Sequence, residues 1–359
     1  MWALDNRTPF AADSSWIRDG DGAEVWIVAV KATYDIGADG STRVAAEQVP
    51  VHSGPLPHAG LASLRYDTDL GPPKPATDIL LVGHAHAQGA APVTELRVGF
   101  RVGSLTRTAR ISGDRHWQRG LLSQAPSPAL PFRRMPLVWE RAFGGDELDA
   151  ANGSGNPLGR GIQPDAEGRI WLPNIEPIER PIRRPRDRPA PLGFGPVASH
   201  WPPRRRYAGT YDQAWFDDRR PLPPLDLDPR HAQLAPAGQQ VAGHLRGGEE
   251  IVLFNLTPPG YAANGRLAFI LPRLTLAFQT LFDDGTSVAG RALIHSLILE
   301  PDHPRVSVVH HLALPCHARV NRLDRTRIRL KQRPLDRPAA PVTDDLDWPA
   351  ADRDAEADA

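Results

Sequence analysis

The chain has 359 residues, of which 41% are hydrophobic, and this is enough to bury a large core. Its 42 basic and 42 acidic residues cancel, which argues against a general binder of nucleic acid or of acidic membrane surfaces. The sequence has no apolar run of about 18 residues and no basic-then-apolar start, so we expect neither a transmembrane helix nor a signal peptide. The single cysteine, Cys316, excludes an internal disulfide and a multi-cysteine metal site. It also suits a reducing compartment, so we expect a cytoplasmic protein.

The first part of the chain is predicted to form antiparallel β-hairpins. Residues 24–36 are rich in β-branched and aromatic side chains and end at a Gly/Asp turn, which predicts a strand. Residues 78–87 predict a second strand. Apolar and polar residues alternate over 96–102, and a return strand is expected through Ala109 and Ile111. Such alternation is typical of sheets with one buried face.

The segment from Pro173 to Gly265 shows no repeating apolar pattern. It has too much Pro and Gly for helices or long strands, and too many aromatic residues for a disordered linker. Long irregular segments that stay ordered are usually functional. We therefore expect a recognition surface in this part of the chain.

The C-terminal part returns to strands, and the predicted fold class is mainly β. Strands are expected at residues 250–256, 266–271, 273–282, 291–299 and 306–314. In the last of these, Val306, Val308, His310 and Leu312 should share one face. Residues 320–331 are the only segment of more than ten residues in which apolar side chains could recur with the 3.6-residue period of a helix.

We expect antiparallel sheets in two packed β regions, with long Pro/Gly-rich ordered loops and few helices. The predicted regions are an N-terminal antiparallel β region (1–120), an irregular segment packed on the scaffold (121–249), a C-terminal antiparallel β region (250–332) and a disordered tail (333–359).

Two groups of histidines were candidates for chemistry. His84 and His86 lie two apart on a predicted strand, so they would face the same side and could share a metal ion. No carboxylate or histidine at a supporting spacing accompanies them, which favours a structural or surface role. The other group comprises His310, His311, Cys316 and His317. Neighbours on a strand point to opposite faces, and a lone cysteine among apolar residues is more often a small buried hydrophobe, so this group predicts neither a nucleophile nor a metal site.

Two carboxylates lie beside aromatic residues. Glu140 in W-E-R and Asp212 in G-T-Y-D-Q-A-W could form a glycosidase pair or a sugar-binding platform. The structural alternative is that Asp212 caps a turn by accepting bonds from backbone N–H groups. The glycines at 144–145 and 153–155 lack the strand–loop–helix context and the lysine of a phosphate-binding loop. We assign no catalytic, cofactor-binding or metal-binding residue.

A series of motifs, taken in order, resembles a known family. They are M-W-A-L-D-N-R-T-P-F-A-A (1–12), S-L-R-Y-D-T-D-L-G-P-P-K-P-A-T-D-I-L-L-V-G (63–83), G-D-R-H-W (113–117), W-E-R-A-F-G-G (139–145), N-P-L-G-R-G (156–161), L-P-N-I-E (172–176), R-Y-A-G-T-Y-D-Q-A-W (206–215) and A-P-A-G-Q-Q (235–240). The series is similar to the DUF2169 proteins of bacterial type VI secretion clusters over about residues 1–300. Each motif by itself is weak, and their order makes the resemblance specific. Leu227 and Gln233 depart from the family pattern, which has Phe and Asn there, and V-V-H-H at 308–311 fits less well.

The resemblance implies a non-enzymatic adaptor or chaperone. Such a protein would bind a toxic effector, a PAAR-like tip protein or both, and help to load them onto the VgrG spike, with no cofactor, nucleic acid or membrane as partner. The motif residues that we take as a possible interaction surface are Trp139, Glu140, Arg141, Phe143, Tyr207, Thr210, Tyr211, Asp212 and Trp215. Aromatic and arginine side chains of this kind dominate interface hot spots, although each tryptophan could instead fill the core beneath the loops. The alternatives are a carbohydrate-active or metal-dependent hydrolase and a structural component of the secretion apparatus.

Overall fold

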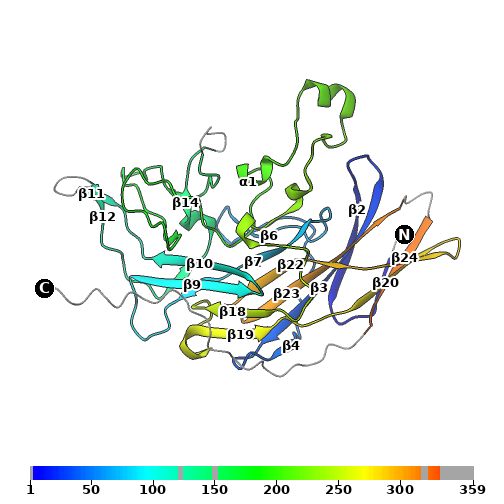
Figure 1. The fold of residues 1–359 in the computed structure, drawn as a ribbon, viewed down its shortest axis with the longest axis horizontal. Coiled ribbons are helices and arrows are strands. Elements are labelled where there is room, and N and C mark those ends of the chain that lie inside the picture. The colour runs from blue at the N-terminus through cyan, green and yellow to red at the C-terminus, as the bar shows by residue number, and fades with distance from the viewer. Residues whose placement is uncertain (1–2, 120–123, 148–152, 317–321, 332–359) are drawn as a thin grey trace.

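A computed structural model describes residues 3–119, 124–147, 153–316 and 322–331. The fold is mainly β, as predicted, and consists of several sheets joined by long irregular loops (Figure 1). The helical segments are short: α1 (Pro202–Arg205), η1 (Trp139–Arg141), η2 (Trp215–Arg219), η3 (Pro229–Ala232), η4 (Ala237–Gln239) and η5 (Ala263–Gly265). Within the described ranges, no helix has the length and apolar character needed to cross a membrane.

The central sheet has the strand order β17–β7–β22–β23–β3–β2. Its strands are β2 (Ala11–Arg18), β3 (Glu24–Ile36), β7 (Ala76–Leu81), β17 (Gln240–Ala242), β22 (Leu293–Glu300) and β23 (Arg305–Pro315), and β4 (Thr42–Val44) pairs with β3. The pair β7–β22 is parallel, whereas β3 runs antiparallel to both β2 and β23. Strand β3 is buried along nearly its whole length, so this sheet is covered on both faces.

A second sheet has the order β16–β10–β9–β18–β19. Its strands are β9 (Glu95–Val102), β10 (Leu105–Ser112), β16 (Ile175–Glu176), β18 (Glu250–Phe254) and β19 (Arg266–Ile270). An outer sheet has the order β1–β24–β20–β21, with β1 (Ala3–Asn6), β20 (Leu276–Phe282), β21 (Ser287–Gly290) and β24 (Leu323–Leu330). Smaller ladders join β5 (Leu56–Pro57) to β6 (Leu64–Tyr66), β8 (His84–His86) to β13 (Arg134–Pro136), β11 (Trp117–Arg119) to β12 (Gln124–Pro126), and β14 (Phe143–Gly144) to β15 (Arg160–Gly161).

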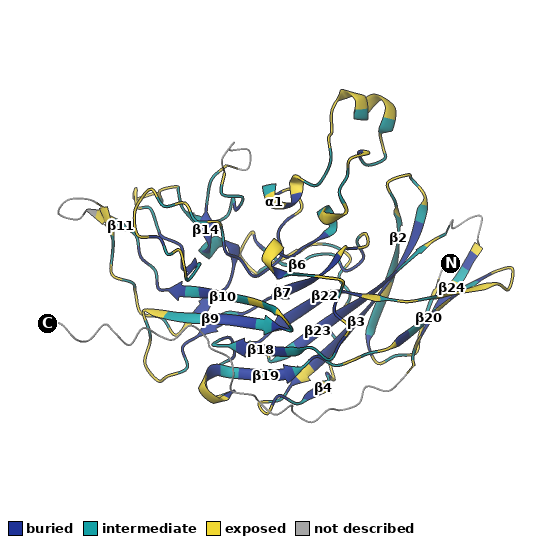
Figure 2. Cartoon of the chain, viewed as in Figure 1, coloured by how far each residue is buried: buried dark blue, intermediate teal, exposed yellow. Residues whose placement is uncertain are grey.

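The two faces of the central sheet pack against different parts of the chain. Val28, Val30 and Tyr34 of β3 belong to the main core, which the central sheet shares with the second and outer sheets. Ile27 and Ala29, on the opposite face, belong to a smaller core that the loops around residues 66–70 and 234–235 cover. Figure 2 shows that burial is concentrated in these sheets and that the outer loops are exposed.

Most predicted strands are present, and two expectations need correction. The predicted strand 78–87 is divided into β7 and β8. Residues 323–330 form strand β24 and not a helix. Strands of the predicted N-terminal and C-terminal β regions pair with one another: β3 pairs with β23, β9 with β18, and β1 with β24. The predicted tail, 333–359, lies outside the described residues.

Candidate functional site

Trp139, the first predicted surface residue, is buried and 5% exposed. Its indole Nε1 donates to the carbonyl oxygens of Gly195, at 3.3 Å, and Pro196, at 2.9 Å. The ring meets Trp201 edge-on, with 5.5 Å between ring centroids. Gly193 lies against the same ring, and a Cβ there would come within 2.5 Å of it. Trp139 and Trp201 therefore fill the core beneath the loops, and neither presents an exposed ring to a partner.

Glu140 follows in η1 and holds a neighbouring loop in place. Its Oε1 accepts hydrogen bonds from the backbone N–H groups of Ala62, at 3.0 Å, and Ser63, at 2.8 Å. Its Oε2 accepts from the Ser63 hydroxyl at 2.7 Å. The Glu140 carboxylate thus has a structural role that the sequence did not predict.

Phe143, in β14, is buried and 3% exposed.

Arg141 belongs to a polar cluster centred on Asp114. The Oδ1 atom of Asp114 accepts hydrogen bonds from Arg141, at 3.1 Å, Arg160, at 3.0 Å, and the Asn174 amide, at 3.0 Å. Asn174 also donates its backbone N–H to the Arg141 carbonyl at 2.9 Å and its amide to the Ser112 carbonyl at 2.9 Å. Burial by itself would raise the pKa of Asp114, but the amide and the two guanidinium groups hold it below its usual value.

Residues from four of the quoted motifs meet at the Asp114 cluster. G-D-R-H-W supplies Asp114, W-E-R supplies Arg141, N-P-L-G-R-G supplies Arg160 and L-P-N-I-E supplies Asn174. Segments that are far apart in sequence are thereby joined at one partly buried carboxylate. Sequence reasoning missed Asp114, and the only available signal was a polar side chain in each of these motifs.

The second group of predicted residues lies in an arm, defined here as residues 207–228, which projects from the body beyond α1 (Figure 1). The base of the arm is closed by a hydrogen bond from the Asp228 N–H to the Tyr207 carbonyl at 3.0 Å. The guanidinium groups of Arg206 and Arg230 lie 4.7 and 4.3 Å from the centroid of the Tyr207 ring. Thr210 donates its N–H and its hydroxyl to Asp226 at 2.9 and 2.8 Å. The two sides of the arm are therefore tied together near its base.

The outer part of the arm is ordered by its own side chains. Asp212 Oδ1 accepts from the Trp215 N–H at 2.9 Å, which confirms the turn-capping role proposed for this carboxylate. Trp215 donates its indole N–H to the Leu222 carbonyl at 2.8 Å. The Tyr211 ring packs edge-on against Trp215, with 4.7 Å between centroids.

Three large apolar side chains on the arm face solvent. Tyr211 is 58% exposed, Phe216 is 51% exposed and Leu225 is 82% exposed. The arm also rests on the turn between β2 and β3, where Arg219 donates to the Gly20 carbonyl oxygen. Figure 2 shows the exposed character of the arm in yellow. In the described part of the chain, no hydrogen bond, ion pair or ring contact joins the predicted residues of the arm to those of residues 139–143.

His84 and His86 face the same side of β8, as predicted, and share one carboxylate. His84 Nδ1 and His86 Nε2 each lie 2.7 Å from an oxygen of Asp302. Arg134 donates to the same carboxylate at 3.0 Å and places a positive charge beside it. Burial would raise the pKa of Asp302, but the bonds to the two histidines hold it well below its usual value. Within the described ranges, no group of three or more His, Cys, Asp or Glu is arranged to hold a metal ion.

The histidines near the last predicted strand are buried and do not form a pair with Cys316. His311 stacks on His295, with 3.7 Å between ring centroids and 10° between planes, and its Nε2 lies 3.0 Å from the Gly71 carbonyl oxygen. Burial lowers the pKa of His310 and of His311 to about 4, so both are neutral at pH 7. Burial raises the pKa of the Cys316 thiol, which opposes formation of a nucleophilic thiolate. His317 lies outside the described residues.

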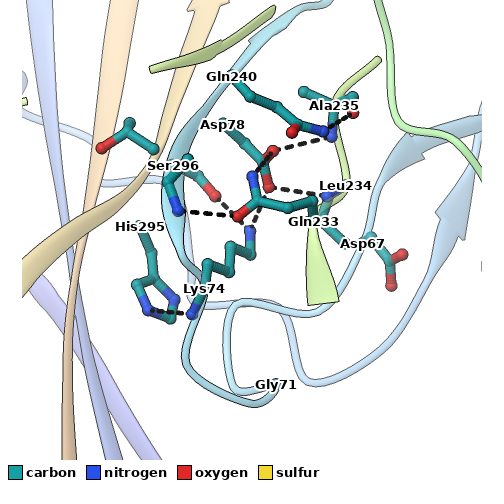
Figure 3. A network of polar contacts seen from close by, with 12 residues as sticks. Asp67, Gly71, Lys74, Asp78, Gln233, Leu234, Ala235, Gln240, His295 and Ser296 are labelled. Atoms are coloured by element: carbon teal, nitrogen blue, oxygen red, sulfur yellow. Dashed lines mark hydrogen bonds and ion pairs between the residues drawn. The ribbon is translucent and has the colours of Figure 1, made fainter. Parts of the chain in front are cut away.

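Figure 3 shows a buried polar network that fixes the irregular segment to the central sheet. Lys74 Nζ lies 2.7 Å from Asp78 Oδ2 and donates to the Ser296 hydroxyl at 2.9 Å. Asp78 also accepts from the Gln233 amide at 2.7 Å and from the backbone N–H groups of Leu234 and Ala235 at 2.8 and 3.0 Å. The pair comes from the 63–83 motif and binds residues 233–235 to β7.

Comparison with known proteins gives one result that covers most of the chain. A family model described as "Uncharacterized protein conserved in bacteria (DUF2169)" matches residues 21–311. The chain belongs to the DUF2169 family. No curated protein and no solved structure matches it significantly.

The DUF2169 match includes the Asp114 cluster, the Lys74–Asp78 network and the arm. It does not include β1 or β24, which pair with each other in the outer sheet. The outer sheet therefore combines strands from inside and outside the DUF2169 range, since β20 and β21 lie within it.

Proposed function

We propose that this protein is a non-enzymatic, cytoplasmic adaptor of type VI secretion. It binds a toxic effector, a PAAR-like tip protein or both, and helps to load them onto the VgrG spike. The proposal starts from the resemblance of the motif series to proteins of such secretion clusters. The structural observation that carries it is the arm, which projects from the body (Figure 1) and whose Tyr211, Phe216 and Leu225 side chains are exposed.

The arm has the physical properties of a recognition element. Tyr211, Phe216 and Leu225 offer apolar area that water covers in the free protein, and aromatic side chains contribute strongly to interface hot spots. The bonds from Thr210 to Asp226 and from Trp215 to Leu222 hold the arm in one conformation before binding. Because an ordered element loses little conformational entropy on binding, more of its contact energy contributes to affinity.

The hydrolase alternative has less support. Both carboxylates that could have formed a catalytic pair have structural partners, because Glu140 holds the loop at Ala62 and Ser63 and Asp212 caps the turn at Trp215. Their hydrogen bonds account for the presence of carboxylates at these positions without any reaction.

The test is co-expression with the toxin and tip proteins encoded by the neighbouring genes, followed by affinity purification and a titration. We expect a stable complex, and we expect Tyr211→Ala and Phe216→Ala each to weaken it about tenfold or more. The matched controls are Leu56→Ala and Leu130→Ala, which remove leucines that are 46% and 60% exposed outside the arm. Absence of any complex would refute the adaptor function. A complex that the arm variants and the controls affect equally would refute the role of the arm.

A further inference from the structure

The outer sheet presents a cationic surface, which we call the arginine face and define as Asp5, Arg7, Arg325, Arg327 and Arg329. Arg325, Arg327 and Arg329 alternate along β24 with Thr326 and Ile328, which are both 0% exposed. Side chains alternate between the two faces of a strand, so the three arginines lie together on the outward face. The buried face is fixed by the bond from the Trp26 indole N–H to the Thr326 hydroxyl at 2.9 Å.

Strand β1 extends this face on one side. It runs parallel to β24, with Asp5 beside Arg327, and the Arg7 N–H donates to the Ile328 carbonyl at 2.9 Å. The neighbouring positions on the other side, in β20 and β21, carry no charge: they are Ala277, Gln279, Leu281, Ser287 and Ala289.

The positive charge of the arginine face is incompletely neutralised. Asp5 accepts from both Arg7, at 3.0 Å, and Arg327, at 2.7 Å. Hydrogen bonds from Arg7, the larger cause, and from Arg327 lower the pKa of Asp5 to about 2. Asp5 is therefore ionised at neutral pH, and its negative charge is already included in the net charge of the face. Arg325 pairs with Asp324 at 2.7 Å, and Arg329 forms no ion pair with any residue that the structure describes. Like charges held side by side on a sheet repel one another, so an anionic ligand would stabilise this surface.

The same chain contains an anionic segment that follows β24. Residues 344–358 include seven acidic residues and one arginine, so their net charge is six negative. Because the whole chain has 42 basic and 42 acidic residues, the rest of it carries the matching excess of positive charge. This segment also contains Trp348, and an indole ring can stack on a guanidinium group.

The connection is long enough for the segment to reach the face. β24 ends at Leu330, and 13 residues separate it from Asp344. When extended, these residues span at most about 45 Å. The eight residues of β24 extend over only about 26 Å. Residues 344–358 can therefore return along the full length of the strand.

We infer that residues 344–358 bind the arginine face of the same molecule. The carboxylates accept hydrogen bonds from Arg325 and Arg329, which sets the negative charge of the segment against the excess positive charge of the face. This contact is independent of the adaptor function, because it rests on the outer sheet and the charge of the chain and not on the arm.

The test is disulfide formation in the full-length chain with Cys316→Ser. Ala289→Cys places one thiol on the outward side of β21, and Ala350→Cys places the other in the acidic segment. Nearby arginines also change the reactivity of the thiol at position 289, so this reactivity is measured separately with an uncharged disulfide. The normalised rate is the cross-linking rate divided by that reaction rate. We expect rapid intramolecular cross-linking that slows about tenfold when salt is raised to about 1 M, because salt screens exposed charges.

Charge-neutralised variants decide the inference. We expect Asp344→Asn, Asp345→Asn and Asp347→Asn together to slow the normalised rate about tenfold, and Arg325→Gln with Arg329→Gln to do the same. The matched control, Arg183→Gln with Arg186→Gln, neutralises two exposed arginines elsewhere and should leave the rate unchanged. Equal rates in all variants would overturn the inference, and so would cross-linking that yields dimers and not monomers.

Discussion

His310 should make the stability of the protein depend on pH between neutral and mildly acidic conditions. Its ring lies on the face of β23 that carries Val306, Val308 and Leu312, and the residue is 6% exposed. Burial lowers its pKa to about 4, whereas a histidine in the unfolded chain has a pKa of about 6.5. The unfolded state therefore takes up the proton first as the pH falls. The contribution of His310 is complete above about pH 6.5 and is lost progressively toward pH 4.

The magnitude follows from the difference between the two states. At pH 5 the pH is about 1.5 units below the pKa of the histidine in the unfolded chain, whereas the folded histidine is still mostly neutral. Each of these units lowers the free energy of unfolding by about 1.36 kcal/mol. His310 should thus lower the free energy of unfolding by about 2 kcal/mol between pH 7.5 and pH 5.

The assay is urea unfolding followed by tryptophan fluorescence at both pH values. His310→Phe keeps an aromatic ring in the apolar face and removes the titrating group, so its loss of stability should be about 2 kcal/mol smaller than that of the wild type. His303→Phe, at an exposed histidine in the turn before β23, is the control and should behave as the wild type. If His310→Phe loses as much stability as the wild type does, the folded state does not exclude the proton from His310 and the reasoning from burial is wrong.

Three further predictions concern the scaffold and the arm. Trp139→Ala should lower the free energy of unfolding by about 3–5 kcal/mol, because it leaves a cavity under the loops, and a loss below about 1 kcal/mol would show that the loops collapse into it. Lys74→Met should cost about 3 kcal/mol in the same urea titration, since it leaves the Asp78 carboxylate buried without its cation, and a loss below about 1 kcal/mol would contradict this. Phe216→Ala, by contrast, should change stability by less than about 0.5 kcal/mol, measured in the same urea titration, because its side chain is half exposed.

The sequence predicted strands well where local pattern decides the structure. The strand 24–36 was predicted at the residues where β3 begins and ends, because β-branched residues fill it and a Gly/Asp turn closes it. Residues 320–331 were the one stretch that allowed a helical stripe, and the strand at 323–330 was not predicted because its alternation of arginine with buried Thr326 and Ile328 is short and partly polar. The pairing of β1 with β24, more than 300 residues apart, could not be predicted, because strand pairing over such distances leaves no local signal.

The candidate site was predicted only in part, because a sequence motif does not show how deeply its side chains are buried. Trp139 and Tyr211 both lie beside charged residues in motifs, yet one is 5% exposed and the other 58% exposed. Asp114 could not be identified as the centre of a cluster, since its partners come from three separate motifs. The capping role of Asp212 was predictable, because it depends on residues only three positions apart.

The stability of the scaffold and recognition by the arm depend on different residues. Arg204 in α1, at the base of the arm, is 8% exposed and donates to Asp67 at 3.2 Å and to the Val197 carbonyl at 2.8 Å. The chain is thus anchored in the body just before the arm, whereas Phe216, within the arm, is 51% exposed and has the Arg220 guanidinium 5.1 Å from its ring centroid. Substitutions at Arg204 should change both stability and binding, because they move the arm as a whole. Substitutions at Phe216 should change binding without changing stability, and a variant there that unfolds the protein would contradict this separation.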